Sequence, residues 1–406
     1  MNVGDIVKGK IESLASWGDG VIRIEGFVVL IPGTCVGEEV TACVTRVQPR
    51  FASAKIASIE TASPDRITPV CRVPPTGRRI PGCIYDHISY AAELACKQAH
   101  FRSTLQGFTP LKEADSFLLP PVASPRDVHY QNKLVVRVET NAAGRRCIGV
   151  RSKDKGIIDI ESHPLALDSI NACLRGYRVM RDTLRDGSCI TFRWTAFNGT
   201  MSWKDNPTEH LKTLKEKTCF GPLDVPSNGD FHTNPGVSAL LIDEVIAHIK
   251  RHQPVCFVDT YSGVGTFALA AVRNGVETVY GVEHTHALVR LAECNAARLW
   301  LPARFLAMDA FEGVSTVLSK LSTMRRCCVF VDPPCSGLCA TLRKLLVQQR
   351  PEFIFYVSCD PHTLARDLAR FVEVGHYRIL SSQIFDMSPR TAHFLSLTIL
   401  HATEPA

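Results

Sequence analysis

The stretch VDTYSGVGTF, residues 258–267, indicates the fold of the C-terminal half of the chain. An apolar run, VCFVDT, leads into it, and a helical pattern, FALAAVRNG, follows it. A Gly-x-Gly turn between a strand and a helix lets the backbone approach a ligand closely and presents the N-terminal amides of the helix. The stretch therefore predicts a ligand site whose turn contains Gly263 and Gly265.

The next two strand ends support the same site. The run TVYGVE ends in Glu283, twenty residues after Gly263, where a carboxylate can accept hydrogen bonds from both hydroxyls of a ribose. The run FLAMDAF places Asp309 where we expect it to bind an adenine amine. A dinucleotide cradle needs a third glycine, whereas the pattern here, D-x-x-x-G-x-G, resembles motif one of the class I S-adenosylmethionine-dependent methyltransferases. This resemblance implies S-adenosylmethionine as the cofactor.

Apolar strands and helical patterns alternate from about residue 220 to the end of the chain. This alternation predicts a parallel, doubly wound sheet. Together with the resemblance, it implies a class I methyltransferase domain of α/β, Rossmann-like fold over residues 219–406. The runs VFVDPPCSG and FYVSCDP are the expected fourth and fifth strands with the loops that follow them. Both loops then lie at the carboxyl edge of the sheet, where ligands bind.

Each of these two loops carries a cysteine, Cys335 in the first and Cys359 in the second. A thiol beside a methyl donor is best explained by a reaction that needs a covalent activator. Carbon 5 of a pyrimidine is a poor nucleophile, and addition of a thiolate at carbon 6 creates an enolate that can accept a methyl group. A base must then remove the proton from carbon 5 before the cysteine can leave.

Three stretches in this half of the chain are similar to the RNA 5-methyluridine methyltransferase family: VSCDP (357–361), TLARDL (363–368) and FDMSPRTAHF (385–394). The resemblance implies that Cys359 is the nucleophile, which forms a covalent adduct with carbon 6 of a uridine. The residues that it assigns to contacts with S-adenosylmethionine are Tyr261, Glu283 and Asp332.

The sequence departs from this family at the catalytic base. The family has a glutamate in T-G-H-x-E-S, whereas this chain has TAHFLS, with Leu395 in place of the glutamate. A leucine cannot accept a proton. We therefore expect Cys335 to take over proton removal or release of the adduct, with His393 as a further candidate base.

Cys335 itself is a departure, because the family usually has an arginine after D-P-P. The motif DPPCSG resembles that of the RNA 5-methylcytosine methyltransferases, in which this cysteine assists release of the adduct. Two alternatives to a uridine methyltransferase therefore stay open. One is a 5-methylcytosine methyltransferase that uses Cys335 for release, and the other is an RNA-binding relative with weak or no turnover, which Leu395 favours.

A third departure concerns the cofactor. The sequence FHTN, residues 231–234, replaces the F-x-Q-x-N of the family and puts His232 where a glutamine contacts the cofactor. An imidazole can still form a hydrogen bond there, so we expect His232 to be a cofactor-binding residue.

The fourth departure concerns a metal site. Family members with a four-iron four-sulfur cluster have C-x5-C-x2-C and a later Cys-Pro. Here Cys71 and Cys83 occupy the outer positions, but Ile80 replaces the middle cysteine and His163 stands at the fourth ligand. Two thiolates and one imidazole make a poor cluster site, so we expect no intact iron-sulfur cluster. The nearby side chains that can substitute as ligands, for iron or for zinc, are Cys96 and His87.

The first sixty residues alternate like five short strands separated by turn signals, such as Pro32-Gly33. This spacing predicts a small β-barrel. The order of glycines and strands resembles the TRAM domain, an OB-like module of RNA-modifying enzymes, through residues 3–59. We therefore predict a TRAM domain over residues 1–62 and, between it and the methyltransferase domain, an α+β domain over residues 63–218.

Three segments of this central domain have clear patterns. Helical spacing begins at Ile88, and an amphipathic helix is expected over residues 163–184. Between these helices, residues 130–140 and 146–160 have the pattern of two strands of a hairpin.

Composition and charge limit the class of protein. The 406 residues are 45% apolar and 21% charged, which is ordinary for a globular protein. No apolar stretch approaches the roughly 18 residues needed to span a bilayer, and the N-terminus, MNVGDIVKGK, lacks the apolar region of a signal peptide. We therefore expect a cytoplasmic protein that does not bind a membrane. Its 16 cysteines are expected as thiols, ligands or catalysts before disulfides.

The positive charge of the chain is concentrated in its middle. Residues 131–220 carry 16 lysines and arginines against 10 aspartates and glutamates, which equals the net charge of +6 of the whole chain. Such a segment can hold a polyanion through phosphate contacts. The resemblance implies that this partner is RNA, with 23S rRNA as the typical substrate of members that carry a TRAM domain and tRNA as the alternative. No obligate protein partner is indicated.

Overall fold

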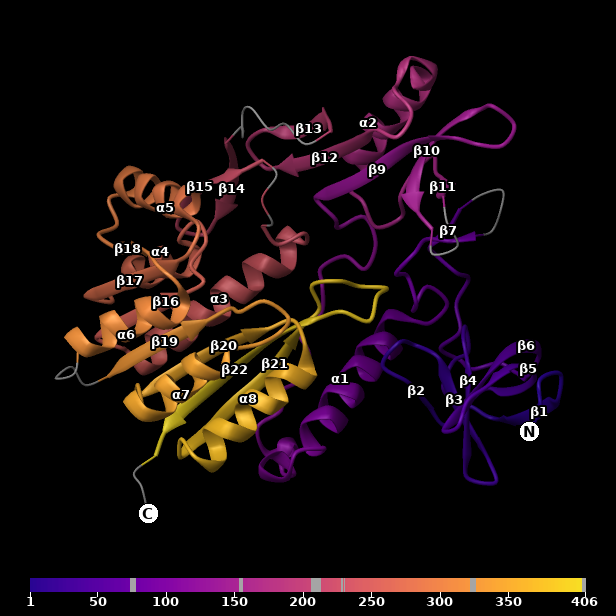
Figure 1. Cartoon of the computed structure of the whole chain (residues 1–406), viewed down its shortest axis with the longest axis horizontal. Helices are drawn as coiled ribbons and strands as arrows, with labels where there is room; N and C mark the ends of the chain where they lie inside the picture. The colour runs from indigo at the N-terminus through magenta and orange to yellow at the C-terminus, as the bar shows by residue number, and fades with distance from the viewer. Residues whose placement is uncertain are drawn as a thin grey trace.

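The computed structural model describes residues 1–73, 78–152, 156–205, 213–227, 229, 231–321 and 326–403. Figure 1 shows three regions in chain order: a small β region at the N-terminal end, a central region with a main sheet and two α-helices, and a larger α/β region that contains the C-terminus. This arrangement confirms the predicted order of an OB-like, an α+β and a Rossmann-like fold. Among the described residues, no helix is both long and apolar enough to cross a bilayer.

The N-terminal region is a six-stranded sheet in the order β1-β5-β6-β4-β3-β2. The strands are β1 (Ile6–Lys10), β2 (Ser13–Leu14), β3 (Gly20–Ile24), β4 (Phe27–Ile31), β5 (Glu39–Val47) and β6 (Phe51–Thr61). The expected count of five strands is wrong because the first run changes partner at Ile11: β1 pairs with β5, and β2 pairs with β3. Strand β1 also contacts β3, so the sheet curls around its apolar core.

The central region contains a five-stranded antiparallel sheet in the order β11-β10-β9-β12-β13. Its strands are β9 (Lys133–Thr140), β10 (Arg146–Arg151), β11 (Ile157–Asp159), β12 (Cys189–Thr195) and β13 (Gly199–Lys204). Strands β9 and β10 form the predicted hairpin. Residues 153–155 of its second predicted strand lie outside the described residues, and β11 is a separate strand that pairs with β10. Two short strands, β7 (Arg72–Val73) and β8 (Arg78–Arg79), pair with each other before this sheet.

Both predicted helices of the central region are present, with different bounds. Helix α1 (Tyr90–Gln106) begins after Ser89, whose hydroxyl accepts a hydrogen bond from the amide of Ala92. Helix α2 (Asp168–Val179) is shorter than the predicted 163–184. The side chain of Asn171 donates to the carbonyls of His163 and Ala166 and so holds the preceding turn outside the helix. Three short 3-10 segments complete the region: η1 (Thr109–Leu111), η2 (Ala114–Ser116) and η3 (Arg181–Thr183).

A hairpin of two strands, β14 (Thr213–Thr218) and β15 (Gly221–Pro226), joins the central and C-terminal regions. Glu216 on β14 accepts a hydrogen bond from Arg193 of the central sheet. On the other strand, the amide of Asp224 donates to Asn295 of the C-terminal region at 2.7 Å. The domain boundary predicted at residues 218 and 219 falls in the turn between these two strands.

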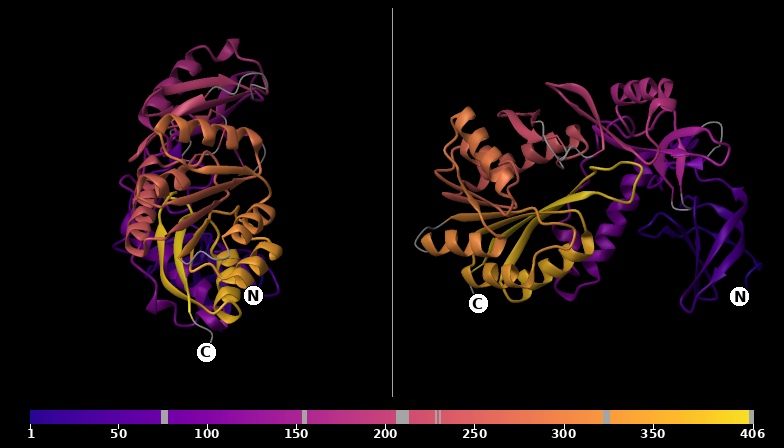
Figure 2. Two further views of the ribbon diagram at one scale, coloured as in Figure 1. Left: turned by 90° about the vertical axis from the view of Figure 1, so that its left-hand side faces the viewer. Right: turned by 45° about the horizontal axis from the view of Figure 1, so that its top comes forward.

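The C-terminal region is a seven-stranded sheet in the order β18-β17-β16-β19-β20-β22-β21, with helices on both faces (Figures 1 and 2). The strands are β16 (Cys256–Thr260), β17 (Thr278–Glu283), β18 (Arg304–Ala307), β19 (Cys327–Val331), β20 (Phe353–Ser358), β21 (Tyr377–Phe385) and β22 (Leu395–Ala402). The helices are α3 (Pro235–His252), α4 (Thr266–Arg273), α5 (His286–Leu299), α6 (Ala310–Lys320), α7 (Ala340–Gln349) and α8 (Pro361–Glu373).

The first five strands of this sheet are parallel, as predicted, and β19 and β20 are the fourth and fifth. The expectation of a wholly parallel sheet is wrong for β22 alone, which runs antiparallel to both of its neighbours, β20 and β21. A loop without a helix connects β21 to β22, and such a connection can join only antiparallel neighbours.

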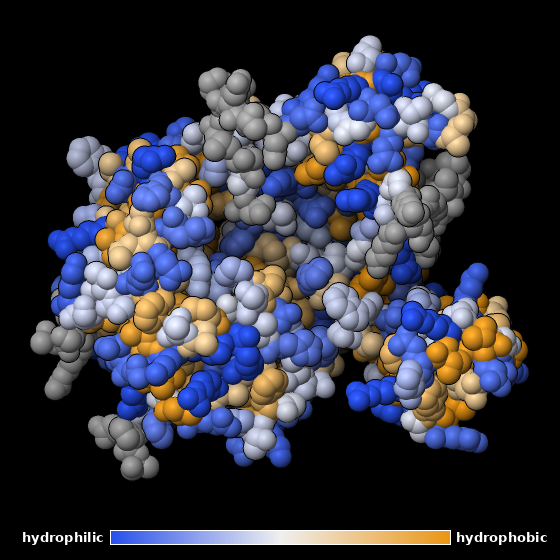
Figure 3. All heavy atoms as spheres, viewed as in Figure 1, coloured by the Kyte–Doolittle hydropathy of each residue, from blue (hydrophilic) through white to orange (hydrophobic). Residues whose placement is uncertain are grey.

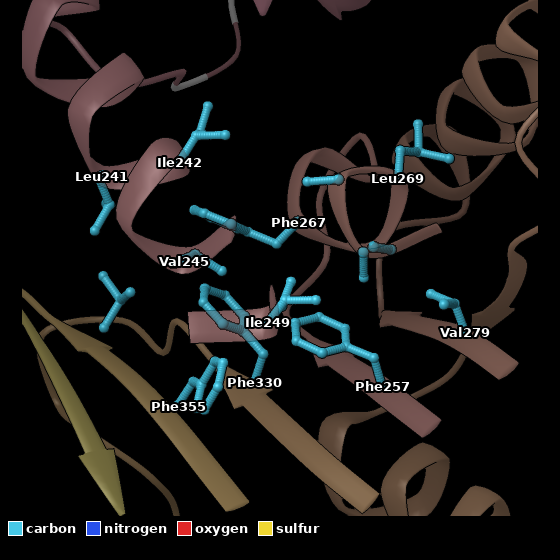
Figure 4. Packing of buried hydrophobic residues seen from close by; sticks show 14 of the residues in the cluster. Leu241, Ile242, Val245, Ile249, Phe257, Phe267, Leu269, Val279, Phe330 and Phe355 are labelled. Atoms are coloured by element: carbon cyan, nitrogen blue, oxygen red, sulfur yellow. The ribbon is translucent and has the colours of Figure 1, made fainter. Parts of the chain in front are cut away.

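Apolar side chains from neighbouring strands form the core beneath the ligand edge of this sheet. Figure 4 shows Phe257, Phe330 and Phe355, one from each of β16, β19 and β20, packed against Phe267 of α4 and against α3. The rings of Phe267 and Phe330 lie 4.3 Å apart between centroids. Because α4 follows the glycine turn directly, this packing fixes the position of the turn.

The loop between β21 and β22, residues 386–394, reaches from the C-terminal sheet to the central region (yellow in Figures 1 and 2). Arg390 of this loop is buried and donates to the carbonyls of Tyr85 and Ile88. Tyr130 of the central region donates to the carbonyl of Pro389 at 2.9 Å. The two regions are therefore held together by a loop that is also close in sequence to the predicted base position.

Candidate active site

The glycine turn after β16 has the backbone conformation that its sequence predicts. Tyr261, Gly263 and Gly265 all have positive φ, at 67°, 53° and 89°. A Cβ atom at Gly265 would lie only 2.8 Å from the ring of Phe305, so no larger residue fits there without a shift. Helix α4 begins at Thr266, directly after this turn, and its N-terminal amides face the same edge of the sheet.

Glu283 ends β17 and lies next to the turn. Its carboxylate accepts hydrogen bonds from the amide of Gly263 at 3.2 Å and from the amide of Thr285 at 2.8 Å. The side chain is buried, and the Nδ1 atom of His284 lies 3.0 Å from its Oε1 atom. The predicted spacing of twenty residues therefore brings Glu283 and Gly263 into direct contact.

A cavity of about 180 Å³ lies in front of the turn. Among the predicted site residues, its lining contains His232, Tyr261, Gly263 and Asp332. Gly265, within the turn, and Glu283, which is hydrogen-bonded to the turn, do not line the cavity. Asp309 is exposed and caps helix α6, where it accepts a hydrogen bond from the amide of Phe311.

Burial changes the charge of two groups that line this cavity. It raises the pKa of Asp332 to about 7, and it lowers the pKa of His232 to about 4. His232 is therefore neutral at neutral pH, and its Nδ1 lies 3.0 Å from the hydroxyl of Ser238. One wall of the cavity thus offers a titratable carboxyl, and another offers a neutral imidazole.

Sequence reasoning missed several residues at this site. Asp259, the first residue of the D-x-x-x-G-x-G pattern, is buried beneath the turn, and its Oδ2 accepts a hydrogen bond from the amide of Ala268 at 2.8 Å. Burial raises the pKa of Asp259 well above its usual value. Within the described part of the chain, Asp259 Oδ1 and the hydroxyl of Ser262 have no hydrogen-bond partner. Phe231 and Leu288 add apolar lining that the motif does not show.

The fit of S-adenosylmethionine to this cavity can be judged from its chemistry. The cofactor has no phosphate group, and the turn accordingly offers amides and carboxylates rather than lysine or arginine side chains. The unpartnered hydroxyl of Ser262 and the carboxyl of Asp332 are suited to polar ligand groups, and Phe231 and Leu288 to an apolar one. The residues present therefore fit the cofactor.

The two cysteines lie at the neighbouring strand ends where the sequence places them. Strands β19 and β20 pair through Val331 and Tyr356, and Cys335 and Cys359 follow in the next loops. The structure joins the two sulfur atoms in a disulfide, with their Cα atoms 5.5 Å apart. The expectation that the cysteines are thiols or ligands before disulfides is therefore wrong for this pair. Its physical reason is the parallel pairing, which brings the two loops together.

Cys359 does not line the 180 Å³ cavity. It is half-buried beside that cavity, after the strand adjacent to β19, and Asp332 of the cavity follows β19. Asp360 then caps helix α8 by accepting a hydrogen bond from the amide of Thr363 at 2.8 Å. Cofactor cavity and cysteine are thus adjacent parts of one edge of the sheet.

Two further residues concern the catalytic base: His393 lies in the loop of residues 386–394, and Leu395 is the first residue of β22. Ser396 pairs with Ser358 across the sheet, and one residue further on each strand are Leu395 and Cys359. Leu395 is partly buried and packs against the core, so it provides no proton acceptor beside Cys359. His393 is exposed, and its amide donates to Thr391.

The residues predicted as doubtful metal ligands do not form one site. Cys71 and Cys83 are buried and hydrogen-bonded to each other, which raises the pKa of the Cys71 thiol far above its usual value. The ring of His163 instead accepts a hydrogen bond from the amide of Leu165, and burial lowers its pKa to about 4. Throughout the described ranges, no three histidine, cysteine, aspartate or glutamate side chains are placed to share a metal ion. These residues do not fit a four-iron cluster.

The substitute ligands considered from sequence also have other surroundings. The Nε2 atom of His87 lies 3.0 Å from the carbonyl oxygen of Thr34 in the N-terminal region. Cys96 is half-buried on α1, where burial raises the pKa of its thiol to about 11. A thiol with a raised pKa is a poor metal ligand, because the thiolate is the binding form.

The open surface beside this edge is visible in Figure 3, where a hollow separates the C-terminal region from the central region. Two residues of the cofactor cavity, Phe231 and His232, also line a second cavity of about 340 Å³ between β12 and α3, together with Trp194. The ligand edge of the sheet is thus accessible from the side that faces the central region.

Comparison with known proteins gives two matches to protein families. The family described as tRNA (Uracil-5-)-methyltransferase matches residues 227–403, and the TRAM domain matches residues 2–57. The second match confirms the TRAM domain expected from the glycine and strand pattern. The first covers the glycine turn, both cysteines and the loop of residues 386–394 between β21 and β22.

Relatives along nearly the whole chain have related descriptions. The 23S rRNA (uracil(1939)-C(5))-methyltransferase RlmD of Bordetella parapertussis is 27% identical over 98% of this chain and 93% of its own length. A relative from Synechocystis sp., described as an uncharacterized RNA methyltransferase, is 26% identical over 98% of this chain and 96% of its own length.

A solved structure shows the same fold. The Pyrococcus abyssi tRNA (uracil-54, C5)-methyltransferase, in complex with S-adenosyl-L-homocysteine, has a TM-score of 0.74 and 22% identity, and the match covers 97% of this chain and 99% of that one. The two family matches and the cofactor cavity described above thus assign residues 227–403 to the tRNA (Uracil-5-)-methyltransferase family and residues 2–57 to a TRAM domain, the combination of an S-adenosylmethionine-dependent RNA uracil-C5-methyltransferase.

Proposed function

We propose that this chain methylates carbon 5 of a uridine in 23S rRNA through a covalent bond between Cys359 and carbon 6. The observation that carries this proposal is the position of Cys359 at the carboxyl edge of the sheet, one strand from Asp332 in the cofactor cavity. The description of the Bordetella relative, which covers nearly the same length, supports rRNA as the substrate. The Pyrococcus structure, a tRNA enzyme, keeps tRNA as the alternative.

S-adenosylmethionine, when bound, supplies an electrophilic methyl group for carbon 5. Tyr261, Gly263, Asp332 and His232 are the residues that would hold it, since they line the cavity. Glu283 would accept hydrogen bonds from the ribose hydroxyls, or it would fix the glycine turn that contacts the cofactor. Its carboxylate already accepts a hydrogen bond from the amide of Gly263. For Asp309 we keep the proposal of an adenine contact, which its exposed position at the end of β18 permits.

The catalytic role of Cys359 is nucleophilic attack. Its thiolate adds to carbon 6, which leaves an enolate whose carbon 5 can accept a methyl group. Addition requires the reduced form of Cys359, because a sulfur that is bonded to Cys335 cannot form a thiolate. The adjacent N-terminal end of α8 favours negative charge at this position.

Proton removal from carbon 5 is the step that the family glutamate cannot perform here. Cys335 is the candidate closest to the nucleophile, with its Cα 5.5 Å from that of Cys359. A thiolate at Cys335 would accept the proton and allow the enzyme-bound carbon–sulfur bond to break. His393 is the alternative, and its exposed position requires the loop to close over the bound base.

RNA binding is proposed for the TRAM domain and the central region. The TRAM match covers residues 2–57, and the basic excess lies in residues 131–220. Phosphate contacts made by such a segment make the affinity strongly dependent on salt. A flipped base would enter the hollow that separates the regions in Figure 3.

Two other functions are favoured by single observations. The contact between Cys335 and Cys359 favours a 5-methylcytosine methyltransferase with two cysteines at its site. Leucine at position 395, beside Cys359, favours an RNA-binding relative without turnover. Both alternatives keep the same fold and cofactor cavity.

Mass spectrometry of total RNA from a deletion strain separates these functions. Loss of one 5-methyluridine supports the proposal, loss of one 5-methylcytosine supports the first alternative, and unchanged RNA supports the second. Complementation with Cys359→Ser should fail to restore the modification, whereas Cys294→Ser, at an exposed cysteine on α5, should restore it. Equal restoration by both variants contradicts a nucleophilic role for Cys359.

A further inference from the structure

The disulfide between Cys335 and Cys359 stands apart from the other cysteines of the chain. Fourteen further cysteines in the described ranges are free, and two pairs of them are also in contact. Cys71 and Cys83 hydrogen-bond in the central core, and Cys256 and Cys327 do so across β16 and β19. These other pairs are buried, whereas Cys335 is exposed. Among the contacting pairs, the one at the methyltransfer site is therefore the one that a reagent in solution can reach.

Hydrogen bonds that do not involve sulfur hold the two cysteine loops in place. The hydroxyl of Thr363 on α8 donates to the carbonyl of Cys335 at 3.0 Å, and Arg366 of the same helix donates to the carbonyl of Ser336 at 3.1 Å. Because Cys359 lies two residues before this helix begins, α8 positions both loops. The proximity of the two cysteines is therefore a property of the fold and remains when the bond is reduced.

The segment between Cys335 and α7 is also held by hydrogen bonds to Asp367, which lies in the interior. The carboxylate of this buried residue accepts hydrogen bonds from the amide of Leu338 at 2.9 Å and from Tyr356 of β20 at 2.8 Å. Arg343 on α7 donates to it at 2.7 Å. Gly337 has a φ of +72°, which other residues rarely adopt, and a Cβ atom there would lie 2.8 Å from the carboxylate of Asp367, so the loop needs glycine after C-S. The Cα separation of 5.5 Å that results lies inside the range of about 4.4–6.8 Å in which disulfides form without backbone movement.

We propose that Cys359 is a site of reversible oxidative modification, in which Cys335 acts as the resolving thiol and the resulting disulfide switches off methyl transfer. The inference rests on the proposed nucleophilic role of Cys359. The oxidant is a hydroperoxide, and the reductant that reverses the modification is a dithiol.

The chemistry balances in two steps. The Cys359 thiolate attacks a peroxide oxygen, the O–O bond breaks, and the products are a sulfenic acid and hydroxide, which is protonated to water. The Cys335 thiolate then attacks the sulfenic sulfur, the S–O bond breaks, and hydroxide leaves to form a second water. Two thiols lose two electrons, and one hydrogen peroxide molecule becomes two water molecules. A dithiol returns the two electrons and is itself oxidised to a disulfide.

The modification would protect the nucleophile as well as inhibit it. Without a neighbouring thiol, a sulfenic acid at Cys359 can react with more peroxide to a sulfinic acid, which dithiols do not reduce. With Cys335 in contact, its thiolate attacks the sulfenic acid first and forms the disulfide. An enzyme with this pair loses activity during oxidation and regains it afterwards.

The test uses the full-length protein, treated with hydrogen peroxide and then divided into samples with and without dithiothreitol. Mass spectrometry without reduction measures the fraction of the protein in which the Cys335 and Cys359 peptides are cross-linked. We expect this fraction to equal the fractional loss of methylation activity on an rRNA transcript. Dithiothreitol should restore both the free peptides and the activity. Inactivation without this cross-link, or inactivation that dithiothreitol does not reverse, overturns the proposal.

Variants make the test independent of catalytic activity. In Cys335→Ser, the same peroxide treatment should convert the Cys359 peptide to its sulfinic acid mass, and dithiothreitol should not reverse this change. Cys339→Ser, an exposed cysteine four residues from Cys335, is the matched control and should form the 335–359 cross-link as the wild type does. A reversible Cys359 product in Cys335→Ser, or loss of the cross-link in Cys339→Ser, contradicts the assignment of the resolving thiol.

The mass measurements also separate this inference from the proposed function. A reduced protein that forms the cross-link on oxidation but methylates no RNA contradicts the proposed function and, with it, the switch. A protein that methylates RNA and shows no cross-link after peroxide retains its function, and only the switch is wrong.

Discussion

Lys97 donates a hydrogen bond of 2.7 Å to Asp386, although 289 residues separate the two in the chain. Lys97 lies on α1 of the central region, and Asp386 begins the loop after β21. The same ammonium donates to Glu93 at 2.7 Å, and all three side chains are buried. The loop that carries His393 and leads to Leu395 therefore has its origin fixed by a buried cluster of charges between two regions.

Removal of Lys97 should destabilise the protein strongly. In Lys97→Met, two buried carboxylates lose the ammonium that compensates them, and breaking a buried ion pair in this way costs about 3–5 kcal/mol. We expect the urea midpoint and the melting temperature to fall, and limited proteolysis to cut first in the loop 386–394. Arg102→Ala is the control, since Arg102 and Asp115 form an exposed pair on the same helix region, and its loss should cost about 1 kcal/mol or less. Equal effects of the two substitutions contradict the assigned role of the buried cluster.

Glu283→Gln should weaken the binding of S-adenosylmethionine. The carboxylate accepts two backbone hydrogen bonds at the glycine turn, and a hydrogen bond to a charged group contributes about 1.5–3 kcal/mol, so the expected loss of affinity is about 10-fold to 100-fold. Isothermal titration calorimetry measures it directly. Glu277→Gln is a matched control, because Glu277 is exposed just before the opposite end of the same strand. The affinity of Glu277→Gln for S-adenosylmethionine should equal that of the wild type. A loss of affinity in both variants would indicate a general effect of charge.

Asp332→Asn should stabilise the cofactor-free protein at alkaline pH. Burial raises the pKa of Asp332 to about 7, from an unfolded value of about 3.9. Between these values the folded state holds a proton that the unfolded state has released. The contribution of this group to stability is therefore full below pH 3.9 and is lost as the pH rises through 7.

At pH 8 the wild type holds a buried charge that the asparagine variant lacks. We expect the melting temperature of Asp332→Asn to exceed that of the wild type by roughly 2 °C or more at pH 8, with a smaller difference at pH 5. Asp309→Asn, at an exposed cap position that asparagine also suits, should show no such dependence. An Asp332→Asn variant that is less stable at pH 8 than at pH 5, each relative to the wild type, would contradict the assigned charge.

The protein purified without oxygen should contain no iron-sulfur cluster. Cys71 and Cys83 are hydrogen-bonded to each other, and the ring of His163 accepts a hydrogen bond from the amide of Leu165, so too few ligands face one point. We expect a visible spectrum without cluster absorption and an iron content near zero in a colorimetric assay. Addition of a chelator should leave the melting temperature unchanged. A brown protein with about four irons per chain would show that other residues complete the site.

The sequence predicts the C-terminal region well because its signals are local. A strand, a glycine turn and a helix follow one another within residues 256–273, so the chain order alone indicates the site. Glu283 is found by the same reasoning, because the ends of adjacent parallel strands meet at one edge of the sheet. Side chains such as Cys335 and Cys359 are brought together by that same rule.

Features that depend on distant contacts could not be predicted. The antiparallel strand β22 depends on pairing with β20, and the composition of β22 resembles that of any buried strand. The predicted start of the second helix, residue 163, fails because Asn171 holds the preceding turn by hydrogen bonds. The buried role of Lys97 depends on Asp386, and nothing near either residue indicates the other.

The position of the predicted base shows the same limit at the site itself. The motif comparison identifies Leu395 as a departure, but only the register of β20 and β22 places it beside Cys359. Conversely, the sequence does not show that Asp309 caps a helix and is exposed. Its spacing after β18 predicted a ligand contact, and that role stays a prediction.

Leu395→Glu should restore a base beside the nucleophile and remove the need for Cys335. In the single variant Cys335→Ser, loss of general base catalysis should slow release of the covalent RNA adduct by about 100-fold or more. The double variant with Leu395→Glu should recover much of that rate. Ser396 pairs with Ser358 on the antiparallel neighbour, and this register places residue 395 beside Cys359. Leu395→Gln, of the same length but without a basic carboxylate, is the matched control and should give no recovery. Adduct lifetime on a denaturing gel distinguishes these outcomes. Recovery with glutamine, or a Cys335→Ser variant that releases RNA at the normal rate, would assign the proton to another group, with His393 the next to substitute.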